Sequence, residues 1–234
     1  LSLEEAVEGA DVIVVAVPPL AMPGLFPKLK GIGEDAVVTD VGSVKSFVIE
    51  AARQGMGERF PQFVPAHPIA GSEKSGVEAS AGDLFQGRRV VITPVEETSR
   101  EALGRVRNLW EQTGAHVEVM EAGHHDRILA QTSHLPHMMA FALMEMLAER
   151  REAVKFSAGG LRDIARIAGS DPALWRDIAL TNREALLEAL QHFSEAMRGL
   201  AQAIEHREGE RLLEHLTKGR EGWNTLVKSM SKEL

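Results

Sequence analysis

The feature that most constrains the fold is a change of pattern near residue 120. Before it, short runs rich in β-branched residues alternate with helical segments; after it, no such run occurs. The runs lie at 12–17, 36–39, 63–66, 89–93 and 116–120. They are continuous rather than alternating in polarity, which predicts strands buried on both faces of a mostly parallel sheet. The repetition of strand and helix indicates a layered α/β fold.

Helical segments are predicted between these strands and throughout the second half. In the first half they lie near 2–9, 20–29, 44–55 and 98–113, and Thr98 or Ser99 would cap the last of them. Residues 121–152 predict one long helix with a kink at Pro136, because proline removes a backbone hydrogen bond. Two further helices are predicted at about 172–206, opened by Asp171-Pro172, and at 208–230.

Composition excludes several classes of function. The chain has 34 Asp and Glu against 26 Lys and Arg, and a net charge of −8 argues against nucleic acid as a partner. The absence of cysteine excludes disulfides, thiolate catalysis and Cys-ligated zinc. No apolar run approaches the roughly 20 residues that span a bilayer, and the acidic first residues do not resemble a secretory signal. We therefore expect a cytoplasmic enzyme or a soluble interaction module, with no membrane partner.

One feature of dinucleotide-binding domains is missing from the first half. Such a domain opens with a strand, a Gly-x-Gly-x-x-Gly loop and a helix. Here the first strand, VIVVAV at 12–17, follows a helical segment, and no Gly-rich loop precedes it. Either an N-terminal βαβ unit has been removed, or the protein works without it.

Two segments of the first half carry candidate chemistry. In Asp-Val-Gly-Ser-Val-Lys, at 40–45, a strand passes into a helix, which places Ser43 and free backbone N–H groups at the ligand-binding edge of a parallel sheet. The alternative is that Ser43 only caps the helix. His67 ends a strand and precedes Pro68, which holds it in extended geometry at the same edge. A histidine with an ordinary pKa of about 6.5 suits general-base chemistry, and the alternative is a partly buried histidine at a strand end.

The second half adds a histidine-rich stretch and a pair of arginines. The stretch contains His124, His125, Asp126, Ser133, His134 and His137. His134 and His137 share a helix face, and a polar stripe along a ligand cleft is favoured over a metal site because no His-Glu-x-x-His pattern occurs. Arg162 and Arg166 form a candidate anion clamp, unless they only make surface ion pairs. Trp175 either walls a pocket or fills the core between helices.

Together these segments resemble the prephenate/arogenate (cyclohexadienyl) dehydrogenase family of tyrosine biosynthesis. The matching stretches are VIVVAVPP, DVGSVK, HPIAGSEKSG, the HHD…SHLPH helix and GGLRDIARIAGSDPALWRDI, which run from residue 12 to about 178. The resemblance implies an oxidoreductase that uses NAD or NADP. It would decarboxylate a cyclohexadienyl 2-keto or 2-amino acid oxidatively, giving 4-hydroxyphenylpyruvate or tyrosine, CO2 and the reduced cofactor.

The resemblance also implies a domain organisation and a partner. Residues 1–120 would be a partial dinucleotide-binding domain of Rossmann type, and residues 121–234 an all-α substrate and dimerisation domain. The small-molecule substrate would be prephenate or arogenate, and the chain would form a homodimer through the helical domain. The long apolar stretches at 138–146 and 186–200 indicate the same, since a thin helical domain cannot cover them alone.

Site residues follow from the matched motifs. His67 corresponds to the catalytic histidine, which accepts a hydrogen bond from the ring hydroxyl of the substrate, and Ser43 to a serine that orients it beside the nicotinamide. Arg166 matches the arginine that grips a substrate carboxylate, and His134 a further histidine on the substrate side. The remaining positions are Gly159, Asp163 and Trp175 in the substrate cleft, in part from the partner subunit, Glu73 in a flap over the site, and Val17, Pro18 and Gly42 beside the cofactor.

Two alternatives to this enzyme stay open. Without the Gly-rich loop, we predict that the isolated chain binds nicotinamide cofactor poorly and is inactive or nearly so. It would then be a truncated or repurposed, non-catalytic dimeric relative. The other alternative is a dehydrogenase of the 6-phosphogluconate or 3-hydroxyacid type, which would carry a catalytic Lys or His in its helical domain. The joint presence of Ser43, His67 and Arg166 favours an active prephenate/arogenate dehydrogenase over both alternatives.

Overall fold

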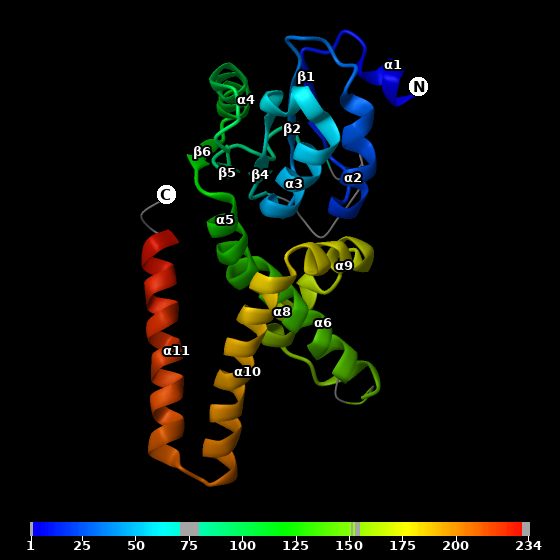
Figure 1. Cartoon of the computed structure of the whole chain (residues 1–234). Helices are drawn as coiled ribbons and strands as arrows, with labels where there is room; N and C mark the ends of the chain where they lie inside the picture. The colour runs from blue at the N-terminus through cyan, green and yellow to red at the C-terminus, as the bar shows by residue number, and fades with distance from the viewer. Residues whose placement is uncertain (1, 71–79, 151, 153–154, 231–234) are drawn as a thin grey trace. The chain divides into compact units, whose positions relative to one another are not determined.

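Six short strands form two three-stranded sheets, ordered β1-β2-β3 and β4-β5-β6, in a computed structural model that describes residues 2–70, 80–150, 152 and 155–230 (Figure 1). The strands are β1 (Val12–Val15), β2 (Val37–Asp40), β3 (Phe63–Val64), β4 (Ala66–Pro68), β5 (Arg89–Ile92) and β6 (His116–Val119). Strands β1, β2 and β3 are parallel, as are β5 and β6, whereas β4 runs antiparallel to β5. The predicted mostly parallel α/β sheet is confirmed.

Pro65 divides the strand predicted at 63–66. Proline has no N–H to give to a neighbouring strand, so β3 ends at Val64 and β4 begins at Ala66. The carbonyl of Pro65 accepts a hydrogen bond of 3.0 Å from the backbone of Thr93, so the chain passes from one sheet into the other at this point. His67, predicted to end a strand, therefore lies in the middle of β4 and pairs with Val91.

Helices cover both faces of the strands. Val38 of β2 belongs to a core with α2 (Met22–Leu25) and α3 (Lys45–Met56), while its neighbour Val37 belongs to a core with α4 (Arg100–Gln112). Because successive residues of a strand point to opposite faces, α4 lies across the strands from α2 and α3 (Figure 1). The predicted burial on both faces holds for β2 and β3, whereas β6 is mostly exposed and Val14 of β1 is 46% exposed.

The other helical elements of the first half are short. They are α1 (Leu3–Val7) and the 3-10 turns Pro19–Ala21, Phe26–Leu29 and Gly57–Gln62. The helix predicted at 20–29 is split into three pieces, because the prolines at 19, 23 and 27 recur before a regular helix can extend. Of the two predicted caps of α4, the residue in the N-cap position is Ser99, whose hydroxyl accepts a hydrogen bond from the backbone of Ala102.

The second half contains only helices among its described residues. Its first elements are α5 (Ala122–Leu129), a π-turn (Ala130–His134), α6 (Leu135–Ala148), α8 (Gly159–Ile167) and α9 (Pro172–Thr181). The irregularity predicted at Pro136 takes the form of this π-helical turn, which ends at His134, two residues before the proline. A wider turn accommodates the ring and the missing N–H without ending the helix.

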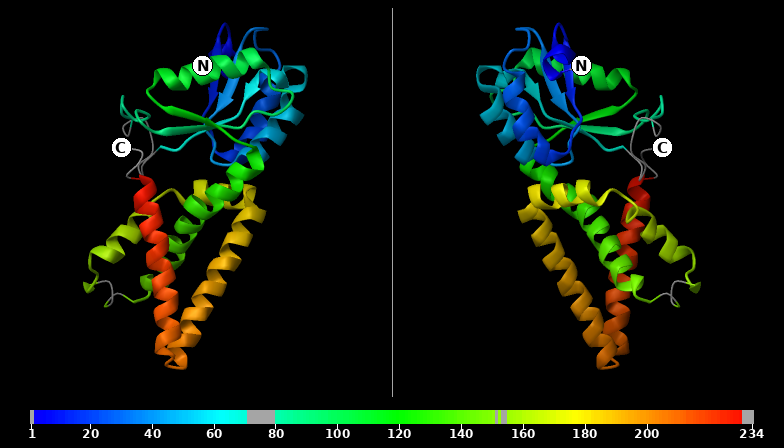
Figure 2. Two further views of the ribbon diagram at one scale, coloured as in Figure 1. Left: turned by 90° about the vertical axis from the view of Figure 1, so that its left-hand side faces the viewer. Right: turned by 90° about the vertical axis from the view of Figure 1, so that its right-hand side faces the viewer.

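The helix predicted at 172–206 is two helices, because Asn182 leaves the helical conformation with φ −104° and ψ 36°. Beyond it lie α10 (Arg183–Glu205) and α11 (Gly209–Met230), joined by a short turn in which Arg207 has a φ of 52° (Figure 2). The contacts between residues divide the chain into two compact units, residues 1–186 and 187–234. The domain boundary predicted after residue 120 follows the change of pattern and stays a prediction. None of the helices in the described ranges is long and apolar enough to cross a bilayer.

Candidate active site

A buried ion pair joins the end of β2 to the start of β4. Asp40 and Lys45 are both fully buried and form a hydrogen-bonded pair. Asp40 also accepts hydrogen bonds from the backbone of Gly42 at 2.8 Å and Ala66 at 3.1 Å, and the Lys45 ammonium donates to the carbonyl of Ala66 at 2.6 Å. Burial lowers the pKa of Lys45, although the charge of Asp40 opposes this shift. The pair fixes the residue that precedes His67.

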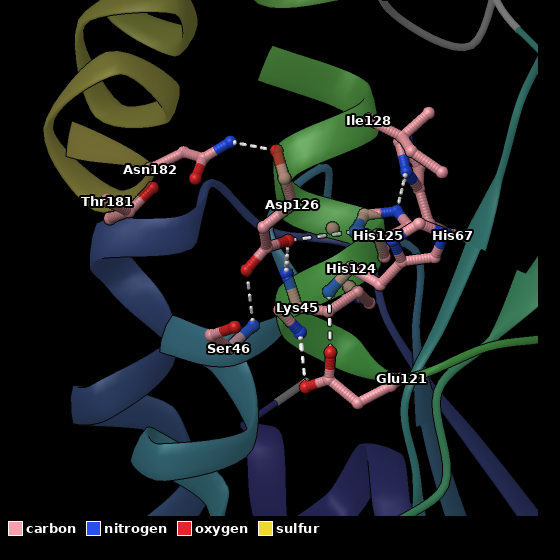
Figure 3. A network of polar contacts seen from close by, with 12 residues as sticks. Lys45, Ser46, His67, Glu121, His124, His125, Asp126, Ile128, Thr181 and Asn182 are labelled. Atoms are coloured by element: carbon pink, nitrogen blue, oxygen red, sulfur yellow. Dashed lines mark hydrogen bonds and ion pairs between the residues drawn. The ribbon is translucent and has the colours of Figure 1, made fainter. Parts of the chain in front are cut away.

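His67 is held on β4 with its ring against a second histidine. Its Nδ1 lies 2.9 Å from Nε2 of His125, and the two rings meet nearly edge to face (Figure 3). Burial, and then the charges of Lys45, His125 and His134, lower the pKa of His67 well below its ordinary value. The ring is therefore neutral at pH 7 and able to accept a proton.

The contact continues from His125 to Asp126, both buried on α5. Nδ1 of His125 lies 2.8 Å from Oδ1 of Asp126. The same carboxylate accepts hydrogen bonds of 2.8 Å from the backbone N–H groups of Lys45 and Ser46 (Figure 3). Burial alone would raise the pKa of Asp126, but the hydrogen bonds from His125, Lys45 and Ser46 lower it. Asp126 is therefore an ionised carboxylate at the N-terminus of α3.

The alternative in which Ser43 caps α3 is wrong. Val44 occupies the N-cap position, and its side chain cannot cap the helix. The carboxylate of Asp126, 81 residues from Lys45 in the sequence, accepts the hydrogen bond that a capping side chain would accept. Backbone N–H groups expected to be free for a ligand are bonded within the protein, that of Gly42 to Asp40 and those of Lys45 and Ser46 to Asp126. The half-buried Ser43 side chain has no hydrogen-bond partner in the part of the chain that the structure describes.

A second group of side chains surrounds Trp175. His137 of α6 is half-buried and stacks on this indole, with ring centroids 3.6 Å apart and planes 19° from parallel. Burial, and to a smaller extent the charge of Arg166, lowers the pKa of His137, although a hydrogen bond to the carbonyl of Ser133 opposes them. Trp175 also packs with Val44 beside the start of α3.

His134 lies deeper than the sequence analysis assumed. It is 1% exposed, and its Nδ1 lies 3.0 Å from the side-chain nitrogen of Asn182. Its Nε2 is buried with no hydrogen-bond partner among the described residues, and burial lowers the pKa of His134 to about 4, against the charge of Asp126. Of the two histidines on this helix face, His137 is the one that both stacks on Trp175 and is influenced by Arg166. The sequence placed both histidines on one polar stripe, but the substrate-side role was expected for His134 and not for His137.

The helix α8 carries three of the predicted substrate residues, Gly159, Asp163 and Arg166. All three are exposed, and no described residue of α8 is buried. Phe156 just before the helix is 81% exposed and Ile164 within it is 48% exposed. An apolar helix face left open in the single chain is consistent with cover by a second subunit.

The comparisons with known proteins agree with the motifs. A model of the prephenate dehydrogenase nucleotide-binding domain matches residues 2–119, and a model of the prephenate dehydrogenase dimerization domain matches residues 121–218. The chain is 38% identical over 222 residues to the cyclohexadienyl dehydrogenase of Zymomonas mobilis. This alignment covers 91% of this chain and 74% of that protein. The chain belongs to the prephenate dehydrogenase family.

Other members of the family are similar at comparable levels. The prephenate dehydrogenase of Bacillus subtilis is 34% identical over 92% of this chain, which spans only 59% of that relative's length. A crystal structure of the Aquifex aeolicus prephenate dehydrogenase in complex with hydroxyphenyl propionate and NAD+ superposes with a TM-score of 0.84 at 36% identity, covering 94% of this chain and 76% of that one. The arogenate dehydrogenase of Synechocystis superposes with a TM-score of 0.77 at 28% identity, over 93% and 80% of the two chains.

The predicted cofactor-side residues lie at one edge of the parallel sheet. Val15 of β1 pairs with Asp40 of β2, so the loop with Val17 and Pro18 and the loop with Gly42 and Ser43 leave neighbouring strand ends. Gly42 is required there, because an added Cβ would lie 2.8 Å from a carboxylate oxygen of Asp40. Beside these loops, the first two N–H groups of α3 are already bonded to Asp126.

Two predictions remain, the flap residue Glu73 and the absence of a metal site. Glu73 lies outside the described residues. No group of three or more His, Asp or Glu side chains within the described ranges is placed to hold a metal ion.

Proposed function

We propose that this chain carries out the oxidative decarboxylation of prephenate or arogenate, giving 4-hydroxyphenylpyruvate or tyrosine and CO2 with reduction of NAD+ or NADP+. Membership of the prephenate dehydrogenase family supports the reaction class, as does similarity to an enzyme crystallised with NAD+ and hydroxyphenyl propionate. The observation that carries the proposal is His67, a neutral, partly buried base held at the ligand-binding edge of the sheet.

The chemistry requires one acceptor of a proton. A bound nicotinamide supplies the acceptor for the hydride that leaves the hydroxyl-bearing ring carbon. As this carbon becomes a carbonyl, the hydroxyl proton passes to the unoccupied nitrogen of His67. The substrate carboxylate then leaves as CO2, and its electron pair passes through the ring to the oxygen, which recovers a proton. Aromatisation drives this second step without a further base.

The substrate needs a local positive charge, because it carries two carboxylates and the chain has a net charge of −8. We propose Arg166 for this role, since guanidinium binds carboxylate through two hydrogen bonds. His137 and Trp175 would form the wall beside it, because His137 stacks on the indole and is influenced by the charge of Arg166. His137 then replaces His134 as the proposed histidine on the substrate side.

The proposal is tested by following reduced nicotinamide spectroscopically, with prephenate or arogenate as substrate. We expect His67→Asn to lower kcat by about 10²–10⁴-fold, the usual loss for a general base, whereas Arg166→Ala should mainly raise KM. Matched controls are His116→Asn, at an exposed histidine of β6, and Arg100→Ala, at an exposed arginine of α4. An unchanged kcat in His67→Asn would exclude this residue as the base. Titration with NAD+ and NADP+ measures which cofactor binds and how tightly.

We further propose that the chain works as a homodimer in the cytoplasm. The match of residues 121–218 to a dimerization domain supports the homodimer. Such a partner would also cover the apolar side of α8, where Phe156 and Ile164 are exposed.

A further inference from the structure

A chain of three side chains leads from the proposed base into the protein interior. His67 of β4 contacts His125 at 2.9 Å, and His125 contacts Asp126 at 2.8 Å, both from α5 (Figure 3). His125 is fully buried, so water does not compete for either of its nitrogens. The family resemblance assigned the orientation of His67 to Ser43, but the only side chain bonded to Nδ1 of His67 in the described structure is His125.

When both imidazole rings are neutral, the protons of this chain have one consistent arrangement. Asp126 is ionised and accepts hydrogen bonds from two backbone N–H groups, so it also accepts from Nδ1–H of His125. Neutral His125 then has a lone pair on Nε2, which must face an N–H of His67. Nδ1 of His67 therefore carries the proton, and its Nε2 is left with a lone pair.

We propose that His125 and Asp126 are positioning residues that hold His67 in the one tautomer able to take the hydroxyl proton at Nε2. This proposal rests on the proposed function. After His67 accepts the proton, its Nδ1 proton can pass to Nε2 of His125. His67 is then neutral again, and His125 is an imidazolium beside the carboxylate of Asp126. No other reactant is needed. The O–H bond of the substrate hydroxyl breaks as an N–H bond forms at Nε2 of His67, and the Nδ1–H bond of His67 breaks as an N–H bond forms at Nε2 of His125.

Asp126 is suited to this role because it is fixed from two sides. Its carboxylate closes the N-terminus of α3, directly after the loop that carries Ser43. Its backbone carbonyl accepts a hydrogen bond of 2.9 Å from the side chain of Asn182 (Figure 3). Rotation of the carboxylate would break both hydrogen bonds to α3, so the position of His125 is fixed to the same frame as the loop after β2.

The tautomer can be measured without any turnover. In protein labelled with 15N at histidine, NMR at neutral pH should show His67 with a protonated Nδ1 and an unprotonated Nε2, with signals assigned by their loss in His67→Asn. His125→Leu removes the acceptor, and we expect the Nε2–H tautomer of His67 to become populated. His124→Leu, at the exposed neighbouring histidine, should leave the spectrum of His67 unchanged. An Nδ1–H tautomer that persists in His125→Leu overturns the proposal, whether or not the chain turns over prephenate.

Turnover separates positioning from a general loss of structure. We expect His125→Leu to lower kcat at least 10-fold with little change of KM. His125→Gln should restore most of that loss, because its amide oxygen can accept from Nδ1 of His67 while its amide nitrogen donates to Asp126. In serine proteases, replacing the aspartate behind the catalytic histidine by asparagine costs about 10⁴ in kcat through the wrong tautomer. Equal losses in the Leu and Gln variants, with unchanged circular dichroism, would reject the positioning role. If the wild-type chain shows no turnover, the failure belongs to the proposed function, and the NMR result alone decides this one.

Discussion

At the scale of single residues, the candidate site brings buried charges together beneath one neutral histidine. Asp40 and Lys45 form an ion pair with no exposure, and such a pair usually costs as much in lost solvation as it gains in attraction. The role of this pair is therefore to hold neighbouring groups in place. The pair holds both backbone groups of Ala66, and its cation disfavours a second positive charge on His67. Below neutral pH, the low pKa of His67 keeps the ring available as a base.

His134 leads to a prediction about stability and pH. Its pKa is about 4 in the folded chain and about 6.5 when unfolded, so between these values the unfolded state binds more protons. Stability is therefore complete above about pH 6.5 and is lost as the pH falls toward 4. From pH 7 to pH 5 we expect His134 to cost about 2 kcal/mol of unfolding free energy, an order-of-magnitude value. Urea unfolding should show a smaller loss over this range in His134→Gln. An equal loss in both proteins would contradict a buried neutral His134.

The sequence predicted some of these residues and not others, for physical reasons. The position of His67 followed from a strand and a proline, which are local signals. The bond from His67 to His125 joins residues 58 apart, and no periodicity reveals it. His134 and His137 were correctly placed on one helix face, but that face does not show which ring lies deeper. The contacts with Asn182 and Trp175, 48 and 38 residues away, decide that.

At the scale of elements, α3 is the helix on which the site depends, and its packing against the preceding segment is close. Gly55 lies near its C-terminal end and is buried. A Cβ at this position would lie 2.6 Å from Cβ of Phe26 and 3.1 Å from the backbone nitrogen of Pro27. The residue must be glycine for packing, because α3 and the turn at Phe26–Leu29 would otherwise have to separate.

Gly55→Ala is therefore expected to destabilise the protein by about 1–3 kcal/mol, the usual cost of overpacking. In an open helix the same change stabilises by about 0.5–1 kcal/mol, because glycine loses more entropy on folding. Gly104 in α4 is the matched control, since an added Cβ meets nothing within 4 Å. Thermal unfolding of the two variants should thus shift in opposite directions. A shift of the same sign in both would show that the contact with Phe26 relaxes at no cost.

The order of the elements was predictable, whereas their ends were not. Runs rich in β-branched residues located every strand region, and burial on both faces accounts for those of β2 and β3 but not for the mostly exposed β6. Pro65, the prolines at 19, 23 and 27, and Asn182 changed where individual elements stop. The capping of α3 was missed for another reason. The carboxylate that closes it comes from Asp126, and a cap supplied from so far along the chain leaves no mark beside the helix it closes.

At the scale of the whole molecule, the helical second half leaves many apolar side chains exposed in the single chain. On α11 the exposed apolar residues are Leu213, Leu216, Trp223, Leu226 and Val227, each at least 38% exposed. At 100° per residue, these positions fall on one side of the helix. With the exposed α8 and the match of residues 121–218 to a dimerization domain, this side of α11 is the expected contact with a second copy.

Light scattering should therefore give the mass of a dimer, about twice 25.5 kDa. We expect the double variant Leu216→Glu and Trp223→Glu to be a monomer, because two buried, unpaired carboxylates per subunit would each cost several kcal/mol. Lys218→Glu, which also adds negative charge but lies on the opposite side of α11, should remain dimeric. If the wild-type chain is a monomer at micromolar concentration, the interface lies elsewhere or does not form. If all three proteins are dimers, this side of α11 is not part of it. Because α8 carries Arg166, a monomeric variant that also raises KM would link assembly to the substrate site, since helices left without their partner cannot keep a guanidinium in a fixed place.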